Sequence, residues 1–149
     1  MMTKEDSRFE AMLVALREHD YRLTPQRLAV VRLLAESEAH LSAAQIHERL
    51  CEQFPTMSLA TVYRTLNVLK EVEEVLELRV NDDEHRYDGR DPRPHPHVIC
   101  VRCRKIIDFE IPGLSDLAQK VVAATGFQVT GHRLDFFGVC PDCQRDESL

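Results

Sequence analysis

Two cysteine pairs constrain the fold of this chain more than any other feature of its sequence. Two residues separate Cys100 from Cys103, two separate Cys140 from Cys143, and 36 residues lie between the pairs. A two-residue spacing lets a tight turn direct both sulfur atoms at one ion, and two such turns complete the tetrahedral thiolate shell of structural Zn²⁺. We therefore expect the C-terminal part of the chain to fold around a four-cysteine zinc site.

A redox-active Cys-x-x-Cys site is the alternative interpretation of these pairs. A thioredoxin-like site normally follows one strand and begins a helix, whereas we expect both pairs here to flank strands, which favours zinc. The fifth cysteine, Cys51, is expected inside a helix as a small buried residue. An odd number of cysteines also argues against the disulfide framework of a secreted protein.

Composition narrows the class of protein further. The chain has no run of about 18 apolar residues and no apolar secretion signal near its start, so we expect a cytoplasmic protein without membrane contact. Its formal net charge is −6, from 19 basic and 25 acidic residues. Because neutralising phosphates requires Lys and Arg, this charge argues against general nucleic-acid binding and requires any DNA contact to come from clustered arginines.

The first eighty residues predict four short helices followed by a hairpin. Apolar residues recur at helical spacing over 5–19, and three further helices begin at clear capping signals. The expected N-caps are Thr24, Ser42 and Ser58. Proline ends the third helix near Phe54. Residues 76–80 then alternate apolar and polar, and 86–88 return as a second strand, which together are typical of a winged helix-turn-helix whose fourth helix enters a major groove.

A proline-rich segment, 89–97, separates this region from a second one. Beyond it the pattern predicts a compact α/β unit. Its expected strands are 98–100, 106–111 and 127–139, and its expected helix is 113–125.

A second group of residues offers harder metal ligands. His95 and His97 precede the first cysteine pair, and their spacing places both imidazoles on one side of an extended chain. With Asp108 on the following strand, this set suits Fe²⁺, Mn²⁺ or Zn²⁺ rather than Cu⁺. Histidines are also ordinary in an exposed proline-rich segment, so these residues alone leave both interpretations open.

Four segments in chain order carry a family resemblance. They are 21–27 (YRLTPQR), 58–66 (SLATVYRTL), 95–103 (HPHVICVRC) and 138–143 (GVCPDC). Together they resemble the ferric uptake regulator (Fur) family, from about residue 8 to Cys143. The resemblance implies a homodimeric, metal-dependent transcriptional repressor that binds palindromic double-stranded DNA and is not an enzyme.

The resemblance also implies a domain organisation of α+β class. A winged-helix DNA-binding domain would occupy 1–84, a hinge carrying metal ligands 85–97, and a small α/β dimerisation and metal-binding domain 98–149, with the four cysteines as its structural zinc site. The regulatory ligands, for Fe²⁺ or Mn²⁺, match His40, Asp88, His95, His97 and Asp108. The DNA-contacting residues match Arg22, Ser58, Ala60, Thr61, Tyr63 and Arg64.

The identity of Asp108 indicates a branch of the family. Peroxide-sensing members (PerR) have aspartate at this position, where iron-sensing members more often have glutamate. The resemblance implies that peroxide reacting at Fe²⁺ oxidises His40 or His95 and thereby releases the dimer from DNA. A repressor that senses iron, zinc or manganese is the alternative within the family.

Departures from the family pattern add two expectations. Ser115 replaces a glutamate ligand of an additional metal site, of which His132 alone survives, so we expect no third site. Arg104 replaces the usual glycine after Cys103, and Glu73-Glu74 replace a small-Gly turn, so we expect the local backbone to differ.

Two other function classes stay open. One is a zinc-stabilised interaction module without DNA binding, which the loss of operator binding dependent on Fe²⁺ or Mn²⁺ would favour. An enzyme ranks last, because the chain has 5 glycines and contains no His-Glu-x-x-His motif, nucleophile elbow or phosphate-binding glycine loop.

Overall fold

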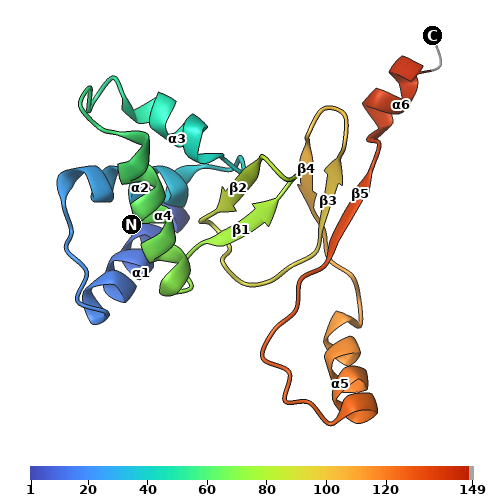
Figure 1. Cartoon of the computed structure of the whole chain (residues 1–149). Helices are drawn as coiled ribbons and strands as arrows, with labels where there is room; N and C mark the ends of the chain where they lie inside the picture. Colours follow the sequence, from blue (N-terminus) through green and yellow to red (C-terminus); the bar gives the residue numbers. More distant parts are fainter. Residues whose placement is uncertain (148–149) are drawn as a thin grey trace. The chain divides into compact units, whose positions relative to one another are not determined.

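The computed structural model describes residues 1–147 and divides the chain into two compact units, Met1–Pro92 and Arg93–Leu149 (Figure 1). The division falls between Pro92 and Arg93, inside the proline-rich segment. Each unit is described separately below. No helix of the described residues is long and apolar enough to cross a membrane.

Four helices form the N-terminal unit. They are α1 (Lys4–Glu18), α2 (Pro25–Glu36), α3 (Ala43–Leu50) and α4 (Leu59–Glu71). The expected caps are confirmed: the side chains of Thr24, Ser42 and Ser58 each accept a hydrogen bond from the backbone N–H three residues later. These bonds satisfy N–H groups that the helix itself leaves without partners.

The helices of this unit pack around a continuous apolar core. Its fully buried members come from every helix and include Met12, Leu16, Leu34, Ile46 and Leu66. The stripe expected on α4 is confirmed, because Val62, Leu66 and Leu69 are all buried. Burial of the stripe leaves the opposite face of α4 exposed.

The third helix is shorter than the sequence predicts. It ends at Leu50 rather than near Phe54, so Cys51 is a half-buried C-cap and not an interior helical residue. Pro55 excludes the helical conformation at Phe54, and the intervening residues form turns. The Cys51 thiol donates to the Glu48 carbonyl at 3.0 Å.

The expected wing is confirmed as a hairpin of β1 (Leu76–Arg79) and β2 (His85–Asp88). A bridge between Leu41 and Tyr87 adds the segment before α3 to its edge. The Tyr87 N–H donates to the Leu41 carbonyl at 2.9 Å. The bridge therefore joins the segment before α3 to strand β2 of the hairpin.

The backbone keeps a glycine-like conformation where the chain departs from the family pattern. Glu73 has φ 58° and Arg104 has φ 64°, in the left-handed region that favours glycine. At the end of α4, Glu73 N–H donates to the Lys70 carbonyl and Glu74 N–H to the Leu69 carbonyl, which is the hydrogen-bond pattern of a Schellman cap. The Schellman geometry therefore sets a positive φ at Glu73 even without glycine, while Arg104 has positive φ in the turn after β3, where its N–H donates to the Cys100 carbonyl at 3.0 Å.

A three-stranded sheet with the order β4-β3-β5 forms the centre of the C-terminal unit. Its elements are β3 (His97–Cys100), β4 (Ile106–Asp108), α5 (Leu114–Thr125), β5 (Asp135–Gly138) and α6 (Pro141–Glu147). Strand β3 pairs antiparallel with β4 and parallel with β5. One strand in the middle thus determines the register of both neighbours.

Two strand predictions were too long, and one helix was missed. The last strand covers Asp135–Gly138 rather than 127–139, and β4 ends at Asp108 rather than at residue 111. The reason is the short central strand: β3 has four residues, so the ladders with its neighbours cannot extend further. The unpredicted α6 begins at Pro141, the favoured first position of a helix.

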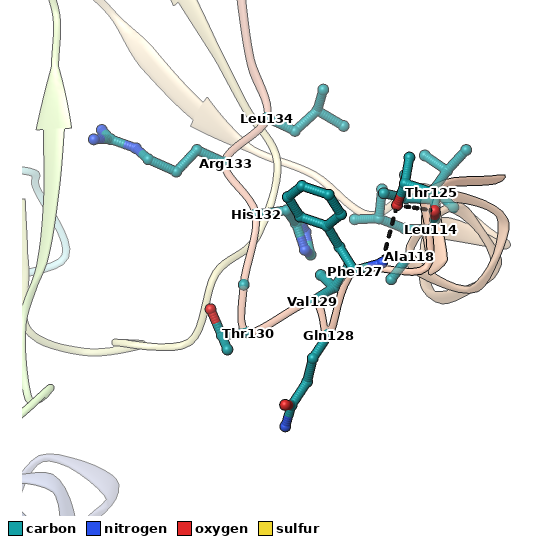
Figure 2. A pocket seen from close by; sticks show the side chains of 13 residues that line it. Leu114, Ala118, Thr125, Phe127, Gln128, Val129, Thr130, His132, Arg133 and Leu134 are labelled. Atoms are coloured by element: carbon teal, nitrogen blue, oxygen red, sulfur yellow. Dashed lines mark hydrogen bonds between the residues drawn. The ribbon is translucent and has the colours of Figure 1, made fainter. Parts of the chain in front are cut away.

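Helix α5 buries none of its residues within the described chain. Its apolar side chains Leu117, Val121 and Val122 are 43–50% exposed. Together with 127–134 the helix lines an open apolar hollow of about 630 Å³, shown in Figure 2. His132 lines this hollow rather than a cluster of metal-ligating side chains.

Replacing Gly89 with alanine should destabilise the N-terminal unit. A Cβ at this position would lie 2.7 Å from Cβ of Leu34 and 3.0 Å from its carbonyl oxygen, so backbone must shift to accommodate it. We expect the free energy of unfolding to fall by about 1–3 kcal/mol.

Tyrosine fluorescence during urea unfolding measures this change selectively, because all three tyrosines lie in the N-terminal unit and the chain has no tryptophan. Gly131→Ala is the matched control, since its Cβ meets nothing within 4 Å. Equal unfolding midpoints for the two variants would contradict the prediction.

Candidate metal centres and DNA-contacting face

The four cysteines of the two pairs meet at one place in the C-terminal unit. Their sulfur atoms all lie within 4.8 Å of one another. The Sγ atoms of Cys100 and Cys143 are 3.8 Å apart, and those of Cys103 and Cys140 are 3.7 Å apart. A tetrahedral Zn²⁺ ion with Zn–S bonds of about 2.3 Å separates its sulfur ligands by about 3.8 Å. The cluster therefore has the dimensions of a tetrathiolate zinc site.

Backbone hydrogen bonds in this cluster favour the thiolate form of Cys100. Hydrogen bonds from the backbone N–H groups of Cys140 and Cys103 lower the pKa of the Cys100 thiol to about 5. At Cys143, contact with the neighbouring sulfur of Cys140 raises the pKa to about 12. Four sulfur atoms so close together cannot all carry negative charge unless a cation neutralises them.

The second cysteine pair does not simply flank a strand, as the sequence predicts for both pairs. Cys140 follows β5, and Cys143 lies in α6, so the second pair does stand between a strand and a helix. The convergence of all four sulfur atoms, rather than the local structure around each pair, is what distinguishes a zinc cluster from a dithiol site.

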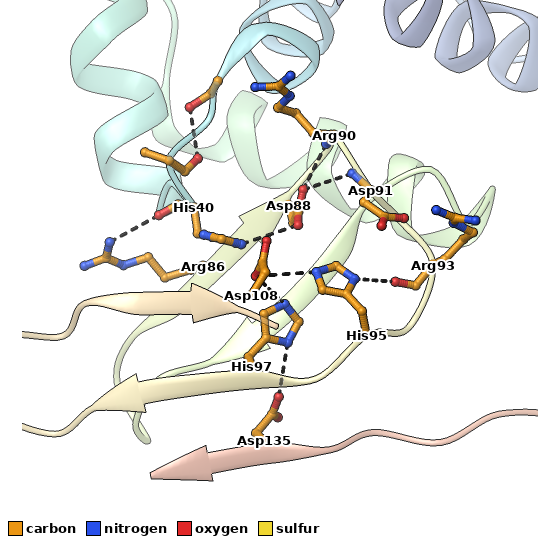
Figure 3. A network of polar contacts seen from close by, with 12 residues as sticks. His40, Arg86, Asp88, Arg90, Asp91, Arg93, His95, His97, Asp108 and Asp135 are labelled. Carbon is orange, nitrogen blue, oxygen red and sulfur yellow. Dashed lines mark hydrogen bonds and ion pairs between the residues drawn. The ribbon is translucent and has the colours of Figure 1, made fainter. Parts of the chain in front are cut away.

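The sheet register of the C-terminal unit places His97 between two carboxylates. On the central strand His97 pairs with Asp108 of β4 on one side and with Asp135 of β5 on the other. Its Nε2 lies 3.2 Å from Oδ1 of Asp108, and its Nδ1 lies 3.4 Å from Oδ1 of Asp135 (Figure 3). The three residues form one row across the sheet.

His95 brings a second imidazole to the same carboxylate. Its Nε2 lies 3.5 Å from Oδ1 of Asp108, and the rings of His95 and His97 are 4.3 Å apart. A divalent ion with bonds of about 2.1 Å holds neighbouring ligand atoms about 3.0 to 3.4 Å apart. The distance from His97 to Asp108 falls in this range and that from His95 exceeds it by about 0.1 Å, so both imidazoles approach one carboxylate oxygen at close to metal-ligand spacing.

The wing creates a second group of ligands, in the N-terminal unit. Because Leu41 bridges Tyr87 in antiparallel fashion, the neighbouring residues His40 and Asp88 come together. Nε2 of His40 lies 3.4 Å from Oδ2 of Asp88 (Figure 3). A two-residue ligand pair is therefore built from segments more than forty positions apart in the sequence.

Asp88 is held by a turn of its own. Its Oδ1 accepts hydrogen bonds from the backbone N–H groups of Arg90 and Asp91, at 2.9 and 3.1 Å. Burial raises the pKa of Asp88, but the contact with His40 and these N–H groups outweigh it, so the pKa lies below its ordinary value. The ionised carboxylate thus keeps Oδ1 in the turn and presents Oδ2 next to His40.

The expected DNA-contacting residues divide between one helix and one loop. Ser58, Ala60, Thr61, Tyr63 and Arg64 lie at the N-cap and in the first two turns of α4. Tyr63 is 46% exposed, and the Arg64 guanidinium donates to Thr61 Oγ1 at 3.1 Å. Arg22 is exposed in the loop before α2. Among these residues, α4 presents hydroxyl, phenol and guanidinium groups on one exposed face.

Sequence reasoning missed Asp135. It belongs to none of the motifs, and its side chain meets His97 only because β5 pairs in parallel with β3. Its one signal was its position inside the expected strand 127–139, which does not reveal the partner strand or the register.

Comparison with known proteins gives one consistent family. The profile of the ferric uptake regulator family matches residues 18–137. The peroxide-responsive repressor PerR of Staphylococcus epidermidis is 38% identical over 141 residues, which cover 95% of this chain and 93% of the relative.

Two solved structures extend the comparison. The ferric uptake regulator of Helicobacter pylori, described as having three functional metal-binding sites, is 27% identical with a TM-score of 0.79, covering 96% of this chain and 95% of that one. PerR from Streptococcus pyogenes, studied for peroxide sensing and gene regulation, is 39% identical with a TM-score of 0.53, covering 91% and 92%.

Removing one sulfur should empty the cysteine cluster of zinc. In Cys143→Ser only three thiolates are available, and we expect the fraction of chains that retain zinc against a chelator to fall at least about tenfold. Cys51→Ser is the matched control, because Cys51 lies in the other unit and outside the cluster. Zinc release is measured with a colorimetric chelator; equal retention in the two variants would rule out the four-thiolate site.

Proposed function

Because the chain belongs to the ferric uptake regulator family, we propose that it is a metal-dependent transcriptional repressor of the peroxide-responsive type. Two copies would bind a palindromic double-stranded DNA operator in the cytoplasm. The observation that carries the proposal is the convergence of His95 and His97 on one oxygen of Asp108, which offers nitrogen and oxygen ligands without thiolate.

Two kinds of metal site have different roles in this proposal. The four cysteines hold Zn²⁺ and stabilise the C-terminal unit. A regulatory Fe²⁺ or Mn²⁺ ion is bound by His40, Asp88, His95, His97 and Asp108. The support for a single shared ion is the ligand count: two ligands in one unit and three in the other each leave the shell of such an ion incomplete. An ion that takes ligands from both units favours one arrangement of the dimer's recognition helices.

When bound by these residues, Fe²⁺ would supply the redox chemistry that activates peroxide beside the imidazoles of His40 and His95. In the net reaction, one peroxide oxygen is inserted into a ring C–H bond of His40 or His95, and the second leaves as water. An oxidised imidazole is a poor ligand, so the two units are no longer held by one ion. The preference for the DNA-binding arrangement is then lost.

The exposed face of α4 is the proposed DNA-reading surface. Arg64 can contact guanine with two hydrogen bonds, Tyr63 can contact a thymine methyl group or a phosphate, and the helix start with Ser58 can accept a phosphate. A net charge of −6 provides no general attraction to DNA. Specific contacts from a correctly spaced pair of α4 helices must therefore supply the affinity.

The exposed apolar face of α5 supports the homodimer. Leu117, Val121 and Val122 lie on a helix with no buried residue, beside the apolar hollow of Figure 2. Apolar surface of this kind is typical of an interface between subunits. We propose that a second copy of the chain covers it.

Metal-by-metal DNA binding tests the function directly. The zinc-loaded protein selects its operator from a pool of random duplexes in the presence of Mn²⁺, and binding of the selected duplex is then measured by fluorescence anisotropy. We expect a palindromic sequence, binding with Mn²⁺ or anaerobic Fe²⁺, and release by peroxide in the Fe²⁺ form only. Mass spectrometry should then find one added oxygen on the peptide of His40 or His95.

Each contrary result identifies another function. A zinc-loaded protein that selects and binds no DNA with Fe²⁺ or Mn²⁺ present would indicate a zinc-stabilised interaction module. Metal-dependent binding that survives peroxide, without oxygen on either histidine, would indicate an iron-sensing or manganese-sensing repressor.

Replacing Arg64 with alanine should weaken binding to the selected duplex. Loss of one bidentate base contact costs about 1–3 kcal/mol, which corresponds to about 5- to 150-fold in affinity. Lys120→Ala removes the same charge from α5 in the other unit and is the matched control. An Arg64→Ala protein that binds as tightly as the control would place the DNA contact elsewhere.

A further inference from the structure

The two ring nitrogens of His97 each face a different carboxylate. Asp108 lies at Nε2 and Asp135 at Nδ1, because β3 pairs with both β4 and β5 at this residue. Figure 3 shows Asp135 on the opposite side of the ring from Asp108. Asp135 is therefore outside the ligand set but in direct contact with one of its members.

A neutral imidazole has one N–H group and one lone pair, and a metal ligand must direct the lone pair at the ion. When Nε2 is the ligand atom, the proton resides on Nδ1. The 3.4 Å between Nδ1 and Asp135 is slightly more than the usual N–H···O range of about 2.7 to 3.2 Å. A shift of a few tenths of an ångström would complete a hydrogen bond to a carboxylate, which both orients the ring and increases its basicity.

His95 gives an internal comparison. Its Nδ1 lies 2.7 Å from the backbone carbonyl of Arg93, so a neutral acceptor holds this ring. The two histidines thus direct Nε2 at the same oxygen of Asp108, but one is supported by a peptide carbonyl and the other by a carboxylate. The two rings therefore differ in the acceptor that faces Nδ1.

We infer that Asp135 is a positioning residue for the regulatory metal: it fixes His97 as an Nε2 ligand and strengthens that bond. This inference rests on the proposed function, since it concerns the metal site of the proposed repressor. It adds a residue that acts on the metal through His97 and has no contact with the ion itself.

Mn²⁺ affinity of the zinc-loaded full chain is the first test. We expect Asp135→Ala to weaken Mn²⁺ binding about 10- to 100-fold. Asp135→Asn, whose amide oxygen can still accept from Nδ1–H, should recover part of the loss. Asp116→Ala, which removes an exposed carboxylate at the start of α5, should bind Mn²⁺ like the wild type. Zinc content and circular dichroism show that each variant is folded.

The ring N–H signals are the second test, and a merely structural role would not change them selectively. With diamagnetic Zn²⁺ in the regulatory site as well, ¹⁵N-labelled protein should show hydrogen-bonded Nδ1–H signals from both His95 and His97. In Asp135→Ala only the His97 signal should be lost to solvent exchange, while the His95 signal persists. Assignment comes from His97→Asn, which lacks the ring.

The outcomes separate the inference from the function on which it rests. If wild-type protein binds no Mn²⁺ beyond the zinc cluster, the proposed function fails. If the wild type binds Mn²⁺ but Asp135→Ala matches Asp116→Ala in affinity and keeps the His97 signal, the role of Asp135 is overturned while the repressor proposal stands.

Discussion

The C-terminal unit depends on four cysteine sulfur atoms meeting at one point. Ile99 and Cys100 are the buried hydrophobic residues that the structure describes in this unit, and α5 contributes none. So little apolar burial cannot offset the conformational entropy of more than fifty residues. A cation bound by the four sulfur atoms joins the turn after β3 to the start of α6, and its binding free energy becomes folding free energy.

Strand pairing then places the ligands of the second kind of site. In the C-terminal unit one row of the sheet aligns Asp108, His97 and Asp135. In the N-terminal unit the bridge between Leu41 and Tyr87 brings their neighbours His40 and Asp88 together. His97, Asp108 and Asp88 thus lie on paired strands, and His40 is next to a bridge residue, so the spacing of these ligands is set by backbone pairing before any ion binds. Pre-organised ligands are what a sensor needs, because little binding energy is then consumed in ordering the site.

Much of the fold follows from local signals. The N-caps Thr24, Ser42 and Ser58 begin their helices where the sequence predicts, because a cap depends only on residues three positions apart. The strand lengths could not be predicted from local signals, because a strand extends only as far as the partner with which it pairs. The four residues of β3 limit β5 to Asp135–Gly138. The left-handed backbone at Glu73 was also missed, because the sequence there lacks glycine while the cap geometry still requires positive φ.

In the candidate sites, too, some features follow from the sequence and others only from the tertiary structure. The sequence alone determined the ligand types, the two-residue cysteine spacing and the family resemblance that points to five regulatory ligands, because these are properties of residues and their order. Only the tertiary structure decided which atoms meet: Nε2 rather than Nδ1 of His95 and His97 at Asp108, Oδ2 of Asp88 at His40, and Asp135 behind His97. Such contacts depend on the register between strands that are distant in sequence, and register is set by packing and hydrogen bonding across the whole sheet rather than by any local pattern.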